Sequence, residues 1–181
     1  NGYRTCTMFV EPQKVQWCPP TEDIQDITVF TDKSLQDVTA IQRLHSKVKI
    51  AWLLECRSVH PFAYDSIIQN ESMFDYIFTF DEELLKRNSD KYILNHIGTS
   101  RIPNHHAKLF KKTKLVSLIA SPKSYLEGHA LRHAIVGATS ADSSLPTIDL
   151  WGGQYKRMPM QCKAQALAEY AYSIVVENSK H

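Results

Sequence analysis

The first part of the chain alternates short apolar runs with segments in which apolar residues recur about every three to four positions. The runs predict buried strands, and the recurring spacing predicts helices between them. We therefore expect strands at residues 27–30, 48–54, 76–80 and 92–94, with helices at 34–44, 61–68 and 82–85. Asp81 is the expected N-cap of the last of these helices. Residues 1–25 are expected to be irregular, because Pro12, Pro19 and Pro20 interrupt any long element.

A polar stretch at residues 95–112 breaks this alternation and is expected to be a linker or a long loop. The alternation then resumes, with strands expected at 114–120, 147–150 and 172–176 and helices at 125–136 and 163–170. Strands that alternate with helices predict parallel sheets with right-handed crossovers. The sequence thus predicts an α/β fold of two Rossmann-like units, residues 1–110 and residues 111–181.

The second unit has few strands for its type, because a doubly wound sheet usually has about five or six. We therefore expect this unit to be incomplete and to leave a sheet edge and apolar surface uncovered. A homodimer, or an exchange of elements between two copies, is the hypothesis that would cover this surface.

The charge balance argues against a nucleic-acid partner, because 21 basic and 19 acidic residues leave a formal net charge of +2. No stretch reaches the roughly 18 apolar residues of a membrane span, so no transmembrane segment is expected. The four cysteines are scattered and form no CxxC pair, which favours thiols in a reducing compartment over a zinc site. We expect a cytoplasmic protein, in solution or peripheral to a membrane.

Common catalytic and phosphate-binding motifs are missing from the sequence, which has no Walker loop, GxGxxG, GxSxG or HExxH. His105-His106 is expected to be a solvated pair rather than a pair of metal ligands, and Gly152-Gly153 a turn. No metal site is therefore expected. Candidate residues must come from the carboxyl ends of the predicted strands, where open parallel sheets bind their ligands.

Glu55 directly follows the apolar strand expected at residues 48–54. Partial burial at a strand end would suit this carboxylate to general-base catalysis. The alternatives are a surface carboxylate and an ion-pair partner for Arg57.

Ser121 follows the first strand of the second unit, and Arg132 lies in the helix after it. The planar fork of an arginine matches a diphosphate, although a surface position on an amphipathic helix remains the alternative. Glu177 and Asn178 follow the last expected strand, where they could bond to ribose or sugar hydroxyls. The alternative there is a helix N-cap at Asn178 or Ser179.

Taken together, the segments 52–55, 74–81, 112–121, 125–133 and 163–179 resemble the α1,3/α1,4-fucosyltransferase family, glycosyltransferase family 10. The match is collinear from Val48 to the last residue, which makes it more specific than any one segment. Segments 112–121 and 125–133 are similar to the opening of the family's donor-binding domain. Segment 163–179, with Lys163, Leu167, Tyr170 and Glu177-Asn178-Ser179, is similar to the family segment that lines the nucleotide-sugar site.

The resemblance implies a GT-B architecture, in which two Rossmann-like domains face each other across an active-site cleft. It implies transfer of fucose from GDP-fucose to a glycan hydroxyl with inversion, without an obligatory metal or cofactor. Glu55 matches the catalytic base and Arg132 the arginine that neutralises the leaving diphosphate. Glu177 and Asn178 fall in the donor-lining segment, which Tyr170 and Lys163 would support.

The sequence departs from the family pattern at its end. Family members continue after Glu-Asn-Ser into a Thr-Glu-Lys motif that contacts the donor, whereas this sequence ends at Lys180-His181. We therefore expect a C-terminally truncated domain and little activity from this chain alone. Two further readings are a transferase of the same family that uses another nucleotide sugar, and a non-catalytic α/β binding module.

Overall fold

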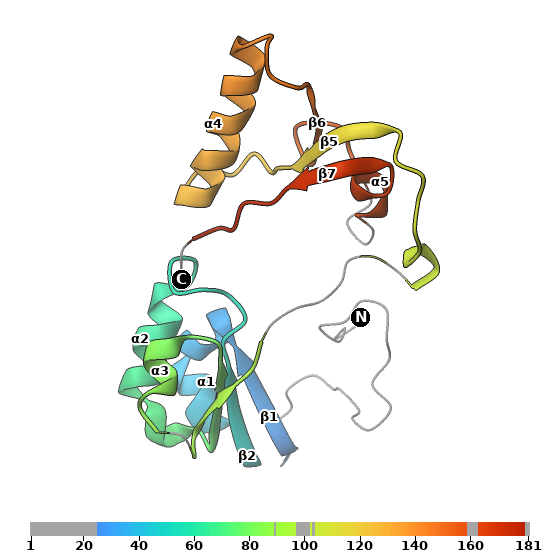
Figure 1. The fold of residues 1–181 in the computed structure, drawn as a ribbon. Helices are drawn as coiled ribbons and strands as arrows, with labels where there is room; N and C mark the ends of the chain where they lie inside the picture. Colours follow the sequence, from blue (N-terminus) through green and yellow to red (C-terminus); the bar gives the residue numbers. More distant parts are fainter. Residues whose placement is uncertain (1–24, 89, 97–101, 103, 159–162, 180–181) are drawn as a thin grey trace. The chain divides into compact units, whose positions relative to one another are not determined.

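The computed structural model describes residues 25–88, 90–96, 102, 104–158 and 163–179. These residues form two compact units, residues 25–96 and residues 102–179, each of which is described by itself (Figure 1). Residues 102–110 group with the second unit, whereas the sequence suggested a boundary at residue 110. Both units are α/β, and every strand pairing within their sheets is parallel, as the alternating pattern predicts.

The first unit is built on four strands whose order in the sheet, β1-β2-β3-β4, follows their order in the chain. Its elements are β1 (Gln25–Thr31), the 3-10 helix η1 (Asp32–Gln36), α1 (Val38–Arg43), β2 (Ser46–Trp52), α2 (Pro61–Gln69), the 3-10 helix η2 (Glu71–Met73), β3 (Tyr76–Thr79), α3 (Glu82–Leu85) and β4 (Tyr92–Leu94). Right-handed crossovers between neighbouring parallel strands place every connecting helix on the same face of such a sheet. The three α-helices do lie together on one side of the strands (Figure 1).

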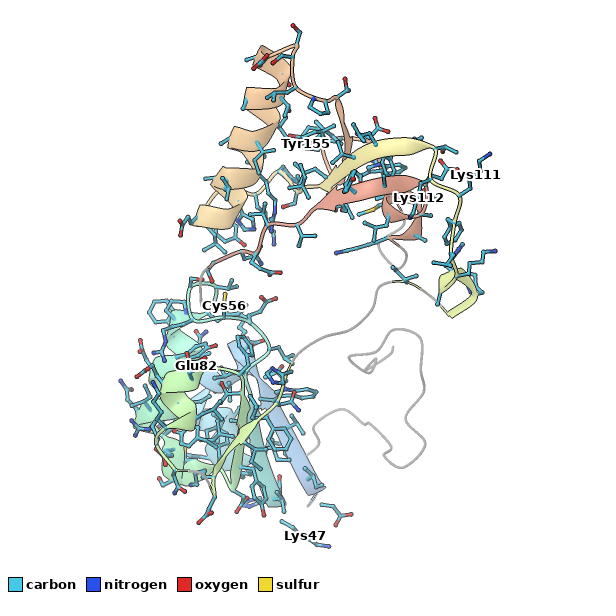
Figure 2. All side chains as sticks on the ribbon, viewed as in Figure 1. Lys47, Cys56, Glu82, Lys111, Lys112 and Tyr155 are labelled. Carbon is cyan, nitrogen blue, oxygen red and sulfur yellow. The ribbon has the colours of Figure 1, made fainter. Side chains whose placement is uncertain are left out.

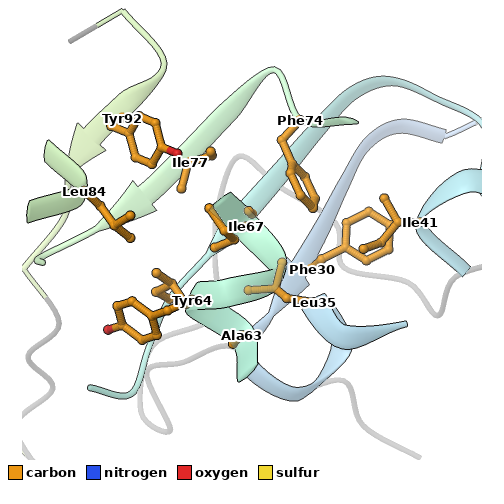
Figure 3. Packing of buried hydrophobic residues seen from close by; sticks show 12 residues of the cluster. Phe30, Leu35, Ile41, Ala63, Tyr64, Ile67, Phe74, Ile77, Leu84 and Tyr92 are labelled. Carbon is orange, nitrogen blue, oxygen red and sulfur yellow. The ribbon is translucent and has the colours of Figure 1, made fainter. Parts of the chain in front are cut away.

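The hydrophobic core of the first unit fills the space between the sheet and these helices (Figure 3). One row of paired strand residues faces it: Phe30 pairs with Ala51, Ala51 with Ile77, and Ile77 with Tyr92. All four are buried, and the helices add Leu35, Ile41, Ala63, Tyr64, Ile67 and Leu84. Since side chains alternate along a strand, the neighbouring positions on each strand must face away from this core.

The helix expected at residues 34–44 is instead two elements that meet at Asp37. The Asp37 backbone leaves the helical region, with φ −88° and ψ 77°, and its side chain accepts a hydrogen bond of 2.9 Å from the Ala40 N–H. A short acidic side chain that caps a new helix ends the preceding turn, and spacing alone does not reveal this break. The expected cap at Asp81 is confirmed, because its carboxylate accepts a bond of 2.9 Å from the Leu84 N–H.

The second unit has the strand order β6-β5-β7. Its elements are the 3-10 helix η3 (Asn104–His106), β5 (Lys114–Ile119), α4 (Glu127–Ala141), β6 (Ile148–Trp151), α5 (Ala164–Leu167) and β7 (Tyr170–Ile174). The helix expected at 163–170 ends at Leu167, and β7 begins at Tyr170 rather than at residue 172. Tyr170 is buried beside Trp151 and Ala166. Tertiary packing therefore extends the strand to residues that the apolar pattern of the sequence left out of it.

Among the described residues, none of the helices combines the length and the apolar character that a membrane crossing requires.

Candidate functional site

A hollow of about 570 Å³ lies in the second unit and is lined by residues that follow two of its strands. Its volume is in the range of small-molecule sites. The residues that line it are Ile119, Ala120, Ser121, Arg132, Gly152, Gly153, Arg157, Met158 and Lys163. Three residues that the sequence selected separately, Ser121, Arg132 and Lys163, are thus brought together on one surface.

The hollow lies where the connections of the sheet change direction. From β5 the chain crosses through α4 to β6 on one side, and it later returns past β5 to add β7 on the other. In open parallel sheets such a switch point, at the carboxyl ends of the strands, is the usual place for a ligand. Ile119 at the end of β5 pairs with Trp151 at the end of β6, which puts Ser121 and Gly152 in neighbouring loops.

Close contact between the main chains of these two loops depends on Gly152. Its φ of +120° is unfavourable for other residues, and a Cβ atom there would lie 1.8 Å from the Ala120 carbonyl oxygen. The loop then turns through Tyr155, whose N–H donates to the Gly152 carbonyl over 3.0 Å, and continues to Arg157 (Figure 2). The glycine pair that the sequence suggested to be a turn therefore also shapes the wall of the hollow.

Arg132 joins α4 to the segment that follows β7. Its Nε donates to the Val176 carbonyl over 3.1 Å, and Nη2 donates to the same carbonyl and, over 3.1 Å, to Oδ1 of Asn178. A guanidinium has further N–H donors on Nη1, so these bonds fix its plane without using all of its capacity. The surface-arginine alternative does not hold, because Arg132 is only partly exposed and lines the hollow.

The first turn of α4 is pressed against the same segment. The Gly128 N–H donates to the Asn178 carbonyl over 3.1 Å, and a Cβ at Gly128 would lie 1.7 Å from the Glu177 carbonyl oxygen. The main chain of Glu177 and Asn178 is therefore held in place, while the Glu177 side chain is exposed and does not line the hollow.

The charge of the hollow is positive. Arg132, Arg157 and Lys163 contribute three cationic side chains, and none of the described lining residues is acidic. Arginine and lysine groups gathered at a strand end suit an anionic ligand such as a phosphate or diphosphate. Sequence reasoning missed Arg157, although two basic residues soon after a strand and a glycine pair were a signal that could have found it.

Tyr170 lies at the amino end of β7, where it pairs with Lys114 at the start of β5. Its hydroxyl donates to Oδ2 of Asp149 over 2.6 Å and accepts from Nε1 of Trp151 over 3.0 Å. Burial, followed by the bond to Asp149, raises the pKa of this hydroxyl. Tyr170 thus belongs to the core of the unit and does not line the hollow at the carboxyl ends.

His129 is buried in the first turn of α4, and its ring meets that of Tyr125 edge-on with centroids 4.9 Å apart. Burial lowers the pKa of His129, and the nearby charges of Arg132, Lys123 and His133 lower it further. A hydrogen bond with Asn178 opposes this shift by raising the pKa. Within the described chain, the ring Nδ1 is buried without a hydrogen-bond partner. Burial and the neighbouring cations therefore favour the neutral form of this imidazole.

In the first unit, β2 ends at Trp52, so Glu55 lies three residues beyond the strand rather than directly after it, and its side chain is exposed rather than partly buried. Its main chain is fixed from two sides. The N–H donates to Oδ1 of Asp32 over 3.1 Å, and the carbonyl accepts from the Tyr64 hydroxyl over 2.9 Å. Asp32 has a φ of +34° and also accepts from the Leu54 N–H over 2.8 Å.

Arg57 does not pair with Glu55, the alternative that the sequence left open. Its guanidinium instead lies 3.2 Å from Oδ2 of Asp81 and stacks on the Tyr64 ring with 4.6 Å to the centroid. Cys56, labelled in Figure 2, lies between Glu55 and Arg57 in the sequence. Its Sγ is 3.2 Å from Oγ of Ser58. The Glu55 carboxylate is therefore presented to solvent from a loop whose main chain is held by Asp32 and Tyr64.

No group of three or more histidine, cysteine, aspartate or glutamate side chains in the described part of the chain could hold a metal ion. His105 and His106 contact each other in η3, with ring centroids 4.3 Å apart. No family model, curated protein or solved structure gives a significant match to this chain. The candidate sites therefore stand on their own geometry.

Proposed function

We propose that the chain is a nucleotide-sugar-dependent glycosyltransferase, with GDP-fucose as donor and a glycan hydroxyl as acceptor. The observation that carries the proposal is the cationic hollow at the switch point of the second unit, lined by Arg132, Arg157 and Lys163. A sugar nucleotide is a ligand of matching chemistry, because its diphosphate is anionic and its ribose and sugar carry hydroxyls that Ser121 can bond. The resemblance of segments 112–133 and 163–179 to the fucosyltransferase family supports the same reading.

In the proposed reaction, the Glu55 carboxylate accepts the proton of the acceptor hydroxyl. The hydroxyl oxygen then forms a bond to the anomeric carbon while the bond from that carbon to the diphosphate oxygen breaks, which inverts the configuration. The departing diphosphate takes up the bonding electrons, and the cations of the hollow stabilise its charge. This scheme assigns the two units to a GT-B arrangement, with the base on one unit and the cations on the other.

Ligand binding to the second unit tests the proposal most directly. We expect GDP and GDP-fucose to raise the thermal midpoint of the chain, by an amount that corresponds to about 2.7 kcal/mol at a hundredfold excess over the Kd. Arg157→Ala should remove most of this shift. Arg43→Ala is the matched control, because Arg43 is exposed in α1 of the other unit and should leave the shift intact.

The ligand series separates the alternatives. A larger shift with UDP than with GDP would favour a transferase that uses another nucleotide sugar, and a shift with FMN alone would favour a non-catalytic binding module. Transfer is then assayed with and without Glu55→Gln, a change at an exposed side chain that should leave the fold intact. If the parent chain shows measurable transfer, an equal rate in this variant would remove Glu55 from the mechanism.

A further inference from the structure

His129 lies where the first turn of α4 meets the segment that follows β7 (Figure 1). Its ring packs edge-on against that of Tyr125, with centroids 4.9 Å apart, and forms a hydrogen bond with the side chain of Asn178. The main chain beside it is held by the bond from the Gly128 N–H to the Asn178 carbonyl. Only 4% of the residue is exposed, so the imidazole is enclosed by these neighbours.

The side chain of Asn178 connects His129 to Arg132. Its Oδ1 accepts the 3.1 Å bond from Nη2 of Arg132, and the same amide makes the bond with the His129 ring. Of these three side chains, Arg132 is the one that lines the hollow. One amide therefore lies between the buried imidazole and the guanidinium of the candidate site.

The place of the His129 ring suits an uncharged imidazole. Nδ1 is buried, and within the described chain it has no hydrogen-bond partner. A protonated ring carries an N–H on both nitrogens, so the N–H on Nδ1 would be a buried donor without an acceptor. Such a group costs free energy, and the ring can avoid that cost by leaving its place against Tyr125 and Asn178.

The charged groups near the imidazole come from three segments of the chain. Lys123 lies in the loop before α4, Arg132 and His133 lie on α4, and their charges all disfavour a cationic ring. Glu127 on α4 and Glu177 after β7 carry exposed carboxylates. A proton on the imidazole would therefore add a buried charge to a group of cations.

We propose that His129, as a neutral imidazole, is a positioning residue of the hollow, which holds Asn178 in the place where it orients Arg132. Protonation displaces the ring, breaks its bond with Asn178 and releases the guanidinium, so binding of an anion weakens as the pH falls. The inference rests on the proposed function, in which the hollow holds the diphosphate of the donor. It extends that function, because it makes donor affinity depend on a side chain that does not line the hollow.

The sign of the pH dependence separates this role from a purely electrostatic one. A histidine that only added charge near the hollow would raise the affinity for an anion when it became protonated. A positioning residue that must be neutral has the opposite effect. GDP-fucose is the suitable probe, because both of its phosphates are esterified and stay ionised, whereas a terminal phosphate such as that of GDP takes up a proton at about pH 6.

The Nε–H signal of Arg132 in heteronuclear NMR spectra reports the orientation of the guanidinium without any ligand. Spectra of the full chain are compared at about pH 7.5 and about pH 5.5, on either side of the ordinary histidine pKa of about 6.5. Loss of the signal in Arg132→Lys assigns it. At the higher pH we expect a shift displaced from that of free arginine, because Nε donates to the Val176 carbonyl over 3.1 Å.

At the lower pH the wild-type Arg132 signal should move towards the value of free arginine. In His129→Gln, which cannot be protonated and keeps an amide donor for Asn178, the signal should stay displaced at both pH values. A wild-type signal that is the same at both pH values would overturn the proposal. Far-UV circular dichroism checks that each variant is folded under both conditions.

Titration with GDP-fucose measures the consequence for binding. For wild type we expect the Kd to rise at least about fivefold from the higher to the lower pH, the lower end of common coupling between sites. His129→Gln should bind equally at both pH values, and His129→Phe, which cannot bond to Asn178, should bind weakly at both. His133→Gln is the matched control and should keep the wild-type response, since Nε2 of His133 lies 3.0 Å from the Lys123 carbonyl oxygen.

The outcomes separate the role of His129 from the proposed function. Wild-type affinity for GDP-fucose that is equal at both pH values, or higher at the lower one, would overturn the role of His129 and leave the donor site standing. The same pH dependence in wild type and His129→Gln would also overturn it. If the chain binds no GDP-fucose at either pH, the proposed function fails, and the Arg132 signal alone decides the role of His129.

Discussion

Arg132 donates a hydrogen bond of 3.1 Å to Oδ1 of Asn178, a residue 46 positions further along the chain. The bond ties the helix after β5 to the segment after β7, on the two sides of the switch point. The sequence selects both residues as donor-binding candidates for separate reasons. Their contact suggests one role for the pair, in which Asn178 helps to aim the guanidinium that lines the hollow.

Replacing Asn178 should therefore affect ligand binding more than folding. Asn178→Leu removes the acceptor of the Arg132 bond, and we expect weaker binding of GDP together with a loss of about 1–3 kcal/mol in unfolding free energy. Asn178→Asp keeps an acceptor at the same place and should retain more affinity. Isothermal titration with GDP and urea unfolding measure the two effects. Equal affinities for the leucine and aspartate variants would show that the bond does not position Arg132.

Two glycines of α4 should respond to alanine in opposite ways. At Gly128 a Cβ would lie 1.7 Å from the Glu177 carbonyl oxygen, so main-chain atoms must move, and we expect a loss of about 2 kcal/mol or more. At Gly137 nothing lies within 4 Å of the added Cβ, and alanine should stabilise the helix by about 0.5–1 kcal/mol. Urea unfolding of both variants checks the pair. A neutral Gly128→Ala would mean that α4 does not press on this segment.

His129 should make the stability of the second unit depend on pH. Burial lowers its pKa in the folded chain, so between that lowered pKa and the ordinary value of 6.5 the unfolded chain binds a proton that the folded chain does not. The free energy of unfolding should therefore fall as the pH drops below about 6.5. His129→Phe should flatten this part of the profile, whereas His105→Gln, at an exposed position, should not. Parallel profiles for wild type and His129→Phe would contradict the assignment.

Tyr170 should matter for folding and not for the ligand. Tyr170→Phe leaves the Trp151 Nε1 without its acceptor and Asp149 without its donor, which should cost about 1–3 kcal/mol. Since the residue lies at the amino end of β7, GDP affinity of the folded variant should equal that of wild type. Unfolding and titration on the same preparation separate the two quantities. A marked loss of GDP affinity without a loss of unfolding free energy would show that Tyr170 contributes to the donor site.

Much of the fold could be predicted from the sequence, because apolar runs such as those around Ile50 and Leu118 identify strands that are buried by their neighbours. Helix ends were less predictable. Asp37 ends one helical turn by capping the next, and Tyr170 starts a strand because it packs on Trp151. Both depend on side-chain contacts and tertiary packing, which the spacing of apolar residues along the sequence does not reveal.

The candidate site was predictable only in part. Ser121, Arg132 and Lys163 could be selected because they follow or neighbour strand ends, and the fold gathers them in one hollow. Arg157 was not predicted, because it lies in a loop whose path is set by Gly152 and its contact with Ala120. For Glu55 a position in the loop after β2 was predictable, but the end of the strand at Trp52 and the exposure of the carboxylate were not, since both depend on the path of the loop held by Asp32.

The order of the strands also bears on how each unit forms. In the first unit every pairing joins strands that are neighbours in the chain, so the sheet can grow by successive closure of short loops. In the second unit β7 must find β5 after α4, β6 and α5 have been passed, and the paired Ser117 and Ser173 are 56 residues apart. Strands that are far apart in the sequence can pair only after a larger loss of chain entropy, which precedes any favourable contact between them. Since Arg132 in the cationic hollow is bonded to the segment after β7, we expect the hollow to be completed only after this non-local pairing has formed.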